Sequence, residues 1–312
     1  MEIKKACPLK DKNWFQTGGS AEYFCEPTTP KEFQEALIFS QDKNLPITLI
    51  GLGANMLISD DGVKGLVIHP LLKTITHAEK NNEISVVAGA GVTIEELINY
   101  CLDNNLIGLE EFSGIPGTVG GSVYINVHYF KYNLQQFVIE GQVIDKKTGE
   151  IKTVDRDWFE FGYDHSKLHD KKYFLVNATF KVQSATEVET AYARGRSDEI
   201  IRHRITRYPY KGTCGCFFRN FHDEEVTLEI NGKKMIYVSY YLDKLGIKGE
   251  LTIGGACVSH QHANMIVNTG NATSTDIIKL AKKMQELVKK EFGILPQTEC
   301  QLVGFKENPL IS

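Results

Sequence analysis

The segment from Gly114 to Gly121 places the strongest constraint on what this chain folds into. It reads Gly-Ile-Pro-Gly-Thr-Val-Gly-Gly, so half of its residues are glycine. Glycine accepts positive φ, and a run of backbone N–H groups without side chains can surround a pyrophosphate. The simpler interpretation is a tight turn before a buried strand at Val123–Ile125. The dense glycine spacing, together with glycine clusters upstream, favours a phosphate-binding loop.

Two upstream clusters, Gly51-Leu-Gly-Ala-Asn55 and Gly89-Ala-Gly91, each lie beside a predicted strand. None of the three reads Gly-x-Gly-x-x-Gly at a strand-to-helix turn, so a Rossmann dinucleotide fold is disfavoured. No Walker-type lysine motif is present in the sequence. Several separate loops that converge on one long anionic ligand suit a dinucleotide such as FAD.

Composition narrows the class of protein. The 312 residues are 42% hydrophobic and 24% charged with a net charge of −4, which argues against nucleic-acid binding through bulk charge. No apolar run approaches the ~20 residues of a membrane span. The N-terminal residues lack an apolar signal core, so we expect a cytoplasmic protein. The seven cysteines indicate reduced thiols, and without paired Cys-x-x-Cys motifs we expect no metal site.

Hydrophobic periodicity and turn residues predict a mixed α+β chain. Thr93 and Glu96 are spaced as a capping box at the start of one helix. We expect helices over 30–44, 94–102, 237–245 and 275–292 and in the middle of 184–212. We expect strands over 46–50, 56–58, 66–68, 84–88, 137–145, 151–154 and 173–182, with turns at 60–62 and 146–149.

Two local features have both a structural and a functional interpretation. The basic stretch is either a solvated helix face or a positive rim for an anionic ligand; it contains Arg194, Arg196, Arg202, His203, Arg204, Arg207 and Lys211. Cys214-Gly-Cys216 and the pair His260 and His262 have spacings compatible with metal or redox chemistry, but ordinary structural roles are the simpler interpretation.

Further motifs occur in a recognisable order. After the three glycine clusters come Asn126, Gly215-Cys-Phe-Phe-Arg-Asn220, Ser259-His-Gln-His-Ala-Asn264 and Phe292-Gly-Ile-Leu-x-x-x-Glu299. This order, over roughly residues 12–305, resembles the UDP-N-acetylenolpyruvoylglucosamine reductase (MurB) family. The chain resembles the shorter, type II branch, because no long tyrosine-bearing insertion follows residue 182.

The resemblance implies an α+β chain with the two-subdomain FAD-binding fold of the vanillyl-alcohol-oxidase/PCMH type and a C-terminal α+β substrate domain. The implied boundaries are 1–71 and 72–200 for the FAD-binding subdomains and 201–312 for the substrate domain. It also implies a two-step reaction in which NADPH reduces the flavin, and the flavin then reduces the enolpyruvyl group of UDP-N-acetylenolpyruvoylglucosamine to UDP-N-acetylmuramate. We expect a monomer without nucleic-acid or membrane partners.

The resemblance assigns roles to residues by their place in the motifs. The implied FAD-binding residues are Gly51, Gly53, Ala54, Asn55, Met56, Gly89, Gly91, Gly114, Pro116, Gly117, Thr118, Gly120, Gly121 and Asn126. The implied substrate-binding residues are Tyr163, Ser166, Arg219, Asn220 and His262. The implied catalytic residues are Cys216 as proton donor and Glu299, with His165 as a further candidate.

The chain departs from the family pattern at three places. Cys216 replaces a serine proton donor, and a thiol with an ordinary pKa of about 8.5 is a stronger acid than an alcohol. Tyr163-Asp-His-Ser166 stands where the family has Tyr-Arg-x-Ser, so Asp164 replaces an arginine that assists the substrate carboxylate. Val127-His-Tyr-Phe-Lys131 replaces Ala-Gly-Ala-Tyr-Gly near the flavin.

Because of these departures, two alternative functions remain beside that of the reductase. The first is a flavoenzyme paralogue that acts on a different carboxylated substrate, and the second is a non-catalytic protein that keeps a ligand-binding role. His165, Arg219 or an arginine of the basic stretch is a candidate to replace the charge lost at Asp164.

Overall fold

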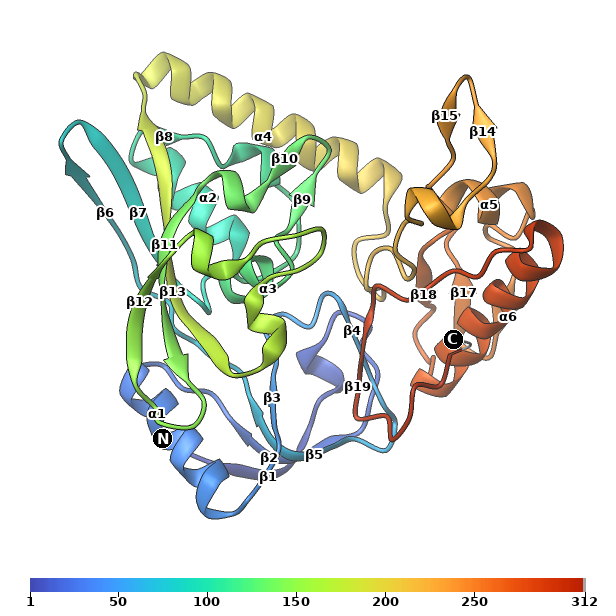
Figure 1. Cartoon of the computed structure of the whole chain (residues 1–312), viewed down its shortest axis with the longest axis horizontal. Coiled ribbons are helices and arrows are strands. Elements are labelled where there is room, and N and C mark those ends of the chain that lie inside the picture. The colour runs from blue at the N-terminus through green and yellow to red at the C-terminus, as the bar shows by residue number, and fades with distance from the viewer. Residues whose placement is uncertain (311–312) are drawn as a thin grey trace. The chain divides into compact units, whose positions relative to one another are not determined.

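The computed structural model describes residues 1–310, which form two units that are each discontinuous in sequence (Figure 1). Unit 1 contains residues 1–5, 23–52 and 65–204, and unit 2 contains residues 6–22, 53–64 and those from 205 onward. Each unit has its own buried apolar cluster. Within residues 1–310, no helix is long and apolar enough to cross a membrane.

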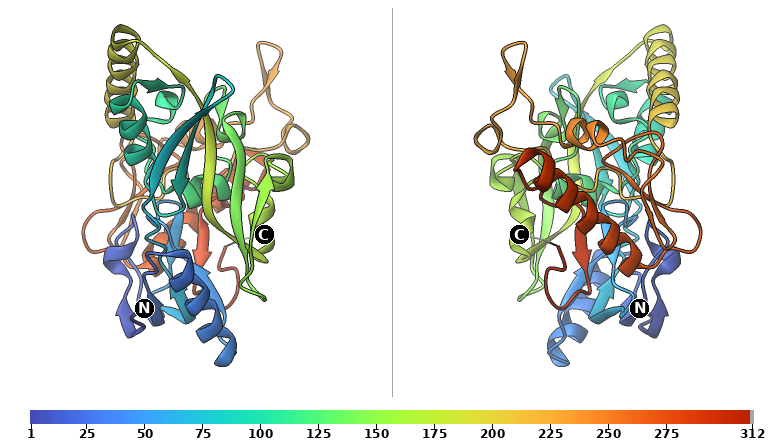
Figure 2. Two further views of the ribbon diagram at one scale, coloured as in Figure 1. Left: turned by 90° about the vertical axis from the view of Figure 1, so that its left-hand side faces the viewer. Right: turned by 90° about the vertical axis from the view of Figure 1, so that its right-hand side faces the viewer.

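An antiparallel sheet forms the centre of unit 1, and its strands lie side by side in Figure 1 and in the left view of Figure 2. The strand order is β12-β11-β13-β7-β6, and β8 pairs with the far end of β13. The strands are β6 (Ile75–Lys80), β7 (Glu83–Gly89), β8 (Leu106–Ile107), β11 (Val138–Asp145), β12 (Ile151–Asp155) and β13 (Tyr173–Ser184).

The helices of unit 1 start at recognisable caps. Thr29 caps α1 (Pro30–Asp42) by accepting from the Glu32 N–H, and Thr93 and Glu96 form the expected capping box of α2 (Ile94–Asp103). Thr118 caps the short α3 (Val119–Tyr124). The long α4 (Glu187–Arg207) follows the sheet and is polar over most of its surface.

A second sheet has the order β1-β2-β5-β3, in which β3 runs parallel to β5. Its strands are β1 (Lys4–Pro8), β2 (Ser20–Cys25), β3 (Ile47–Leu49) and β5 (Val63–Ile68). A small hairpin, β9 (His128–Tyr129) and β10 (Tyr132–Asn133), follows α3 in unit 1. Short 3-10 helices cover Lys10–Lys12, Glu110–Phe112, Leu134–Gln136, Asp157–Phe159, Lys167–Asp170 and Asp223–Glu225.

Unit 2 has α6 (Ser274–Phe292) packed against a small antiparallel sheet (right view of Figure 2). Leu280, Ala281, Met284 and Val288 form the fully buried stripe of α6. The sheet contains β16 (Thr252–Ile253), β17 (Ala256–Val258) and β18 (Ile266–Asn268). The other elements are β4 (Met56–Ile58), which runs parallel to β19 (Gln301–Val303), the hairpin β14 (Glu229–Ile230) and β15 (Lys233–Lys234), and α5 (Val238–Lys244).

The sequence predicted five of the six α-helices and the central strands β7, β11, β12 and β13, but one interpretation was wrong. The end of the glycine segment and the residues after it form α3 instead of a buried strand, because Thr118 supplies an N-cap and the segment 119–124 closes helical hydrogen bonds. The strand β6 was not predicted, because its side chains are mostly exposed and carry no apolar alternation. The three-part division at residues 71 and 200 stays a prediction.

Candidate active site

The glycine segment is joined to the cluster at 89–91 by backbone hydrogen bonds. The Val119 N–H donates to the Val92 carbonyl at 2.7 Å, and the Gly120 N–H donates to the Ala90 carbonyl at 2.9 Å. The Ile94 N–H donates to the Gly117 carbonyl at 3.0 Å. Two of the three predicted loops therefore form one rigid surface in unit 1.

The loop at Gly51 reaches the same surface. A Cβ added to Gly51 would lie 2.6 Å from the Thr118 hydroxyl oxygen, and one added to Gly89 would lie 2.1 Å from the Leu72 carbonyl oxygen. Neighbouring protein atoms therefore require glycine at these two positions. At Gly121 the nearest protein atom to an added Cβ is the Thr118 Oγ1 at 3.6 Å, so the protein itself leaves room there.

Several backbone donors of these loops are available to a ligand. Among residues 1–310, the N–H groups of Gly51, Leu52, Gly117 and Thr118 have no protein acceptor. Four such donors on loops that adjoin at Gly51 and Thr118 fit the pyrophosphate of a dinucleotide. The residues present therefore fit FAD, and these donors would hold its phosphates.

The remaining residues of the 51–56 loop belong to unit 2. The Asn55 side-chain oxygen is buried and has no hydrogen-bond partner in the described part of the chain. A buried acceptor of this kind is rare in a folded protein and marks a place where a ligand donor fits. Asn55 thus remains a predicted cofactor contact.

The segment that follows α3 is fastened to the loop that contains Tyr163. The Asn126 amide donates to the Gly162 carbonyl at 2.9 Å, and its oxygen accepts from the Gln135 N–H at 3.0 Å. The fully buried Ser166 hydroxyl donates to the Tyr124 carbonyl at 2.7 Å. The side chains of Asn126 and Ser166 therefore bind protein, which fits a positioning role better than direct ligand contact.

The two departures at Asp164 and His128 lie beside each other. Asp164 Oδ1 is 3.5 Å from His128 Nδ1, and the Tyr163 ring lies 5.2 Å from the His128 ring. Burial raises the pKa of the Asp164 carboxyl, and the nearby His128 opposes that rise. The sequence showed both departures but gave no sign that they are in contact.

His165 lies in a stack of aromatic rings. Its ring is 4.8 Å from that of His169, which is stacked at 3.8 Å on the Tyr124 ring. Burial lowers the pKa of His169. The structure therefore gives His165 a packing contact, and its catalytic role stays a prediction.

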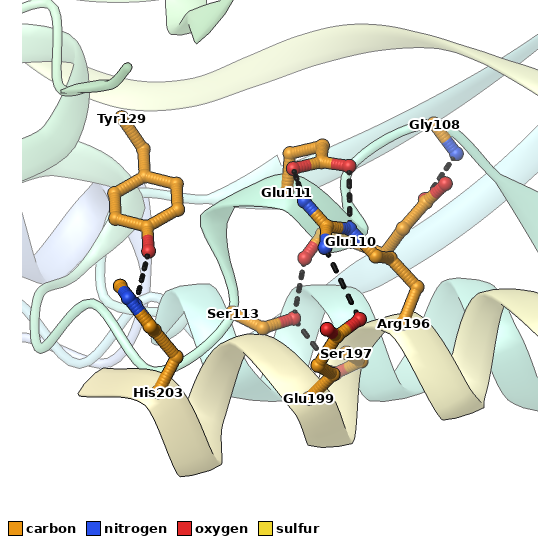
Figure 3. Close-up of polar contacts among 9 residues, drawn as sticks. All are labelled: Gly108, Glu110, Glu111, Ser113, Tyr129, Arg196, Ser197, Glu199 and His203. Atoms are coloured by element: carbon orange, nitrogen blue, oxygen red, sulfur yellow. Dashed lines mark hydrogen bonds and ion pairs between the residues drawn. The ribbon is translucent and has the colours of Figure 1, made fainter. Parts of the chain in front are cut away.

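Charged side chains of α4 are tied to the residues just before the glycine segment (Figure 3). Arg196 forms two 3.0 Å hydrogen bonds to the Glu111 carboxylate, and Ser197 Oγ lies 2.7 Å from Ser113 Oγ. The Arg204 side chain donates to the Gly114 carbonyl at 3.0 Å. For these arginines the structural interpretation of the basic stretch is favoured over the positive rim.

The predicted catalytic residues of unit 2 lie on two extended segments that pair with each other. The Glu299 N–H donates to the Phe217 carbonyl at 2.9 Å, and Phe218 bridges Thr298 in antiparallel fashion. This pairing places Cys216 beside the segment that contains Glu299. Asn264 fixes the first segment by two hydrogen bonds to the Phe218 backbone, at 3.1 and 2.7 Å.

A cluster of thiols surrounds this pairing. Burial raises the pKa of the Cys214 thiol well above its usual range, and Cys300, Glu299 and Cys216 act in the same direction from nearby. Cys216 is half-buried. Within residues 1–310, no group of three His, Cys, Asp or Glu side chains is arranged to hold a metal ion. Cys300 was not singled out from the sequence, because only the antiparallel pairing brings it to Cys214.

The other predicted substrate contacts of unit 2 have protein partners. Arg219 forms a two-point ion pair with Glu225, at 2.7 and 2.8 Å. His262 is largely buried, its Nδ1 accepts from the Asn264 N–H at 3.3 Å, and burial lowers its pKa. Because Nδ1 accepts, a neutral His262 carries its proton on Nε2, which can donate to a ligand. Asn220 follows Arg219 in the chain, and its role as a substrate contact stays a prediction.

The ion pair of Arg219 predicts an acid-sensitive contribution to stability. Hydrogen bonding to Arg219 lowers the pKa of Glu225 from 4.5 to about 2. Because the folded-state pKa is depressed, the stabilisation is present above pH 4.5 and is lost as the pH falls toward 2. Glu225→Gln should lower the free energy of unfolding at pH 7 by up to about 1 kcal/mol. Urea unfolding at several pH values measures this loss.

The matched control for this prediction is Glu224→Gln, which removes a neighbouring exposed carboxylate. The control variant should follow the wild-type profile. A Glu225→Gln profile that runs parallel to wild type down to pH 2 would contradict the assignment of this pair.

The loops of unit 1, with their open backbone donors, define a dinucleotide-binding flavoprotein. Residues 21–155 match the FAD binding domain family, and residues 207–303 match the C-terminal domain family of UDP-N-acetylenolpyruvoylglucosamine reductase. The chain belongs to the UDP-N-acetylenolpyruvoylglucosamine reductase (MurB) family.

Similar proteins support this membership over nearly the whole chain. A UDP-N-acetylenolpyruvoylglucosamine reductase of Listeria monocytogenes serotype 4b is 31% identical over 304 residues, covering 97% of this chain and 95% of the relative. One from Synechococcus sp. is 30% identical over 311 residues, covering 99% and 94%. The crystal structure of the enzyme from Thermus caldophilus matches with a TM-score of 0.76 and 25% identity, covering 97% of this chain and 99% of that one.

These matches confirm the predicted fold class and family. The chain has the α+β FAD-binding fold of the vanillyl-alcohol-oxidase/PCMH type together with a C-terminal α+β domain. The individual residue roles taken from the resemblance stay predictions.

Proposed function

We propose that this chain is an FAD-dependent oxidoreductase that uses NADPH to reduce UDP-N-acetylenolpyruvoylglucosamine to UDP-N-acetylmuramate for peptidoglycan precursor synthesis. The observation that carries the proposal is the full-length relation to enzymes of that name, with the FAD binding domain and the reductase C-terminal domain matched in order. The proposal includes a cytoplasmic monomer that acts on small molecules without nucleic-acid or membrane partners.

The residues of unit 1 bind and orient the flavin. The N–H groups of Gly51, Leu52, Gly117 and Thr118 are proposed to hold its pyrophosphate. When bound, the flavin supplies storage of a hydride between NADPH and the enolpyruvyl group. Asn126 and Ser166 fix the adjoining loops through the Gly162 and Tyr124 carbonyls, so the surface that receives the cofactor is rigid.

The residues of unit 2 handle the proton. The proposed donor is the Cys216 thiol, which gives its proton from Sγ to the carbon next to the one that accepts hydride. Glu299, held to the Phe217 backbone, lies on the paired segment and is proposed to assist that transfer. Asn264 holds the backbone of the Cys216 segment through two hydrogen bonds to Phe218 and so helps to fix the position of the Cys216 side chain.

A second candidate function rests on one observation. Asp164 reverses the charge at the position of the family's arginine, which favours a paralogue that reduces a different carboxylated substrate. Such a paralogue would consume NADPH slowly with the standard substrate.

The test is a purification followed by a steady-state assay. The reductase should be yellow and should oxidise NADPH only when UDP-N-acetylenolpyruvoylglucosamine is present. If NADPH reduces the flavin-loaded protein but the reduced protein does not convert this substrate, the result supports the paralogue. A colourless protein that takes up no FAD supports the non-catalytic alternative and contradicts the proposal.

A further inference from the structure

Two segments of unit 1 that depart from the family pattern are held rigidly together. The residues after α3 and the loop at 162–166 are joined by the Asn126 amide to the Gly162 carbonyl and by the Ser166 hydroxyl to the Tyr124 carbonyl. The loop closes on itself through the Gly162 N–H and the His165 carbonyl at 2.9 Å. Side chains at its tip are therefore placed by hydrogen bonds and do not move freely.

Asp164 is held at this tip in an unfavourable conformation. Its φ is +50°, in the left-handed region that costs a non-glycine residue free energy and that clusters at functional sites. Its Oδ2 is buried and has no hydrogen-bond partner in the part of the chain that the structure describes. A desolvated carboxylate needs a cation nearby.

His128 is the group that faces this carboxylate. Its Nδ1 is 3.5 Å from Asp164 Oδ1, and the two side chains are 33% and 20% exposed. Among the described residues, His128 is the titratable group that acts on the charge of Asp164. Because Asp164 takes the Nδ1 side, Nε2 is the ring nitrogen left for a ligand.

We propose that His128, held by Asp164, is the hydrogen-bond donor that meets the substrate's carboxylate in place of the family's arginine. This inference rests on the proposed function and names the residue that binds the substrate's carboxylate. A carboxylate beside Nδ1 orients the imidazole. Both ring nitrogens of an imidazolium donate, so Nε2 can then donate to an anion while Nδ1 faces Asp164. Asp164 is then a positioning residue, and its negative charge is directed at His128.

Charge explains why the two departures occur together. An arginine carries one positive charge, whereas aspartate at the same position alone would repel a carboxylate. An imidazolium beside the aspartate would make the pair neutral and would restore a hydrogen-bond donor. The pair predicts weaker but still specific recognition of a carboxylate.

The test measures ligand affinity without turnover. The oxidised, flavin-loaded protein is titrated calorimetrically with UDP-N-acetylenolpyruvoylglucosamine in the absence of NADPH, and separately with UDP-N-acetylglucosamine, which lacks the carboxylate. His128→Gln should lower the affinity for the first ligand about 10- to 100-fold, the range for a hydrogen bond to a charged group. It should leave the second ligand unchanged. His77→Gln on β6, an exposed histidine, is the matched control.

The Asp164→Asn variant separates a positioning aspartate from a merely repulsive one. If Asp164 holds His128, Asp164→Asn weakens binding of the enolpyruvyl ligand, and adding His128→Gln to it costs less than in wild type. If Asp164 only repels, Asp164→Asn tightens binding, which overturns the inference. Equal losses for both ligands in His128→Gln would also overturn it.

The failure of this inference is distinguishable from failure of the proposed function. A wild-type protein that binds neither nucleotide sugar contradicts the function itself. Thermal unfolding and the flavin spectrum of each variant verify that the fold and cofactor are retained. A wild-type protein that binds the enolpyruvyl ligand, with His128→Gln equally tight, contradicts only the role of His128.

Discussion

Cys216→Ala should lower kcat by about 10²- to 10⁴-fold, the usual contribution of a positioned general acid. Alanine removes the proton at Sγ but keeps the backbone, which the pairing with residues 297–300 and the Asn264 hydrogen bonds hold. The flavin should still be reduced by NADPH in this variant. Stopped-flow absorbance therefore separates a normal first half-reaction from a slow second one.

Cys216→Ser is the informative comparison, because serine is the residue of the family motif. It should keep most of the activity, since a hydroxyl can also deliver a proton at this position. Cys257→Ala, which removes another half-buried thiol of unit 2, should behave as wild type. A Cys216→Ala enzyme with unchanged kcat would exclude the thiol as the proton donor.

Gly121→Ala should weaken FAD binding while leaving the flavin-free protein intact. An added Cβ at Gly121 would lie 3.6 Å from its nearest protein atom, so the flavin-free protein has room for it. Alanine also stabilises a helix relative to glycine by roughly 0.5–1 kcal/mol. If the pyrophosphate lies against this turn, the added methyl group overpacks the site by about 1–3 kcal/mol. That corresponds to about a 5- to 160-fold higher Kd for FAD. Fluorescence titration of the flavin-free protein measures it.

Gly89→Ala is the control with the opposite outcome. Its added Cβ would lie 2.1 Å from the Leu72 carbonyl oxygen, so the backbone must shift. We expect a lower melting temperature in the flavin-free protein. If the Gly121→Ala protein instead unfolds more easily and keeps its affinity for FAD, the glycine segment is a structural turn and the pyrophosphate binds elsewhere.

Local signals in the sequence predicted much of the fold. The capping box at Thr93 and Glu96 and the apolar stripe of α6 depend on residues within one or two turns, so pattern and propensity suffice to find them. The phosphate-binding role of the glycine segment stays a prediction, and the simpler interpretation of a turn before a buried strand was wrong. The helical outcome depends on Thr118 as a cap within a glycine-rich stretch.

Contacts between distant residues could not be predicted in the same way. The sequence showed Asp164 as a charge reversal, but not that His128 lies beside it, because the 35 residues between them fold back before the two side chains meet. It assigned Arg219 to the substrate, which stays a prediction, and gave no sign of the ion pair that Arg219 forms with Glu225. Motif order identifies a family and its general site, but the partners of each side chain come from tertiary packing.

The central claim is that this chain reduces the enolpyruvyl group. The most direct measurement is mass spectrometry of the product formed when the prereduced protein is mixed anaerobically with UDP-N-acetylenolpyruvoylglucosamine in D2O. We predict loss of the enolpyruvyl ligand and a product that carries two deuterium atoms, because the transferable N–H hydrogen of a reduced flavin exchanges with D2O and the added proton also comes from solvent. Recovery of unchanged ligand from a protein that remains reduced would contradict the claim.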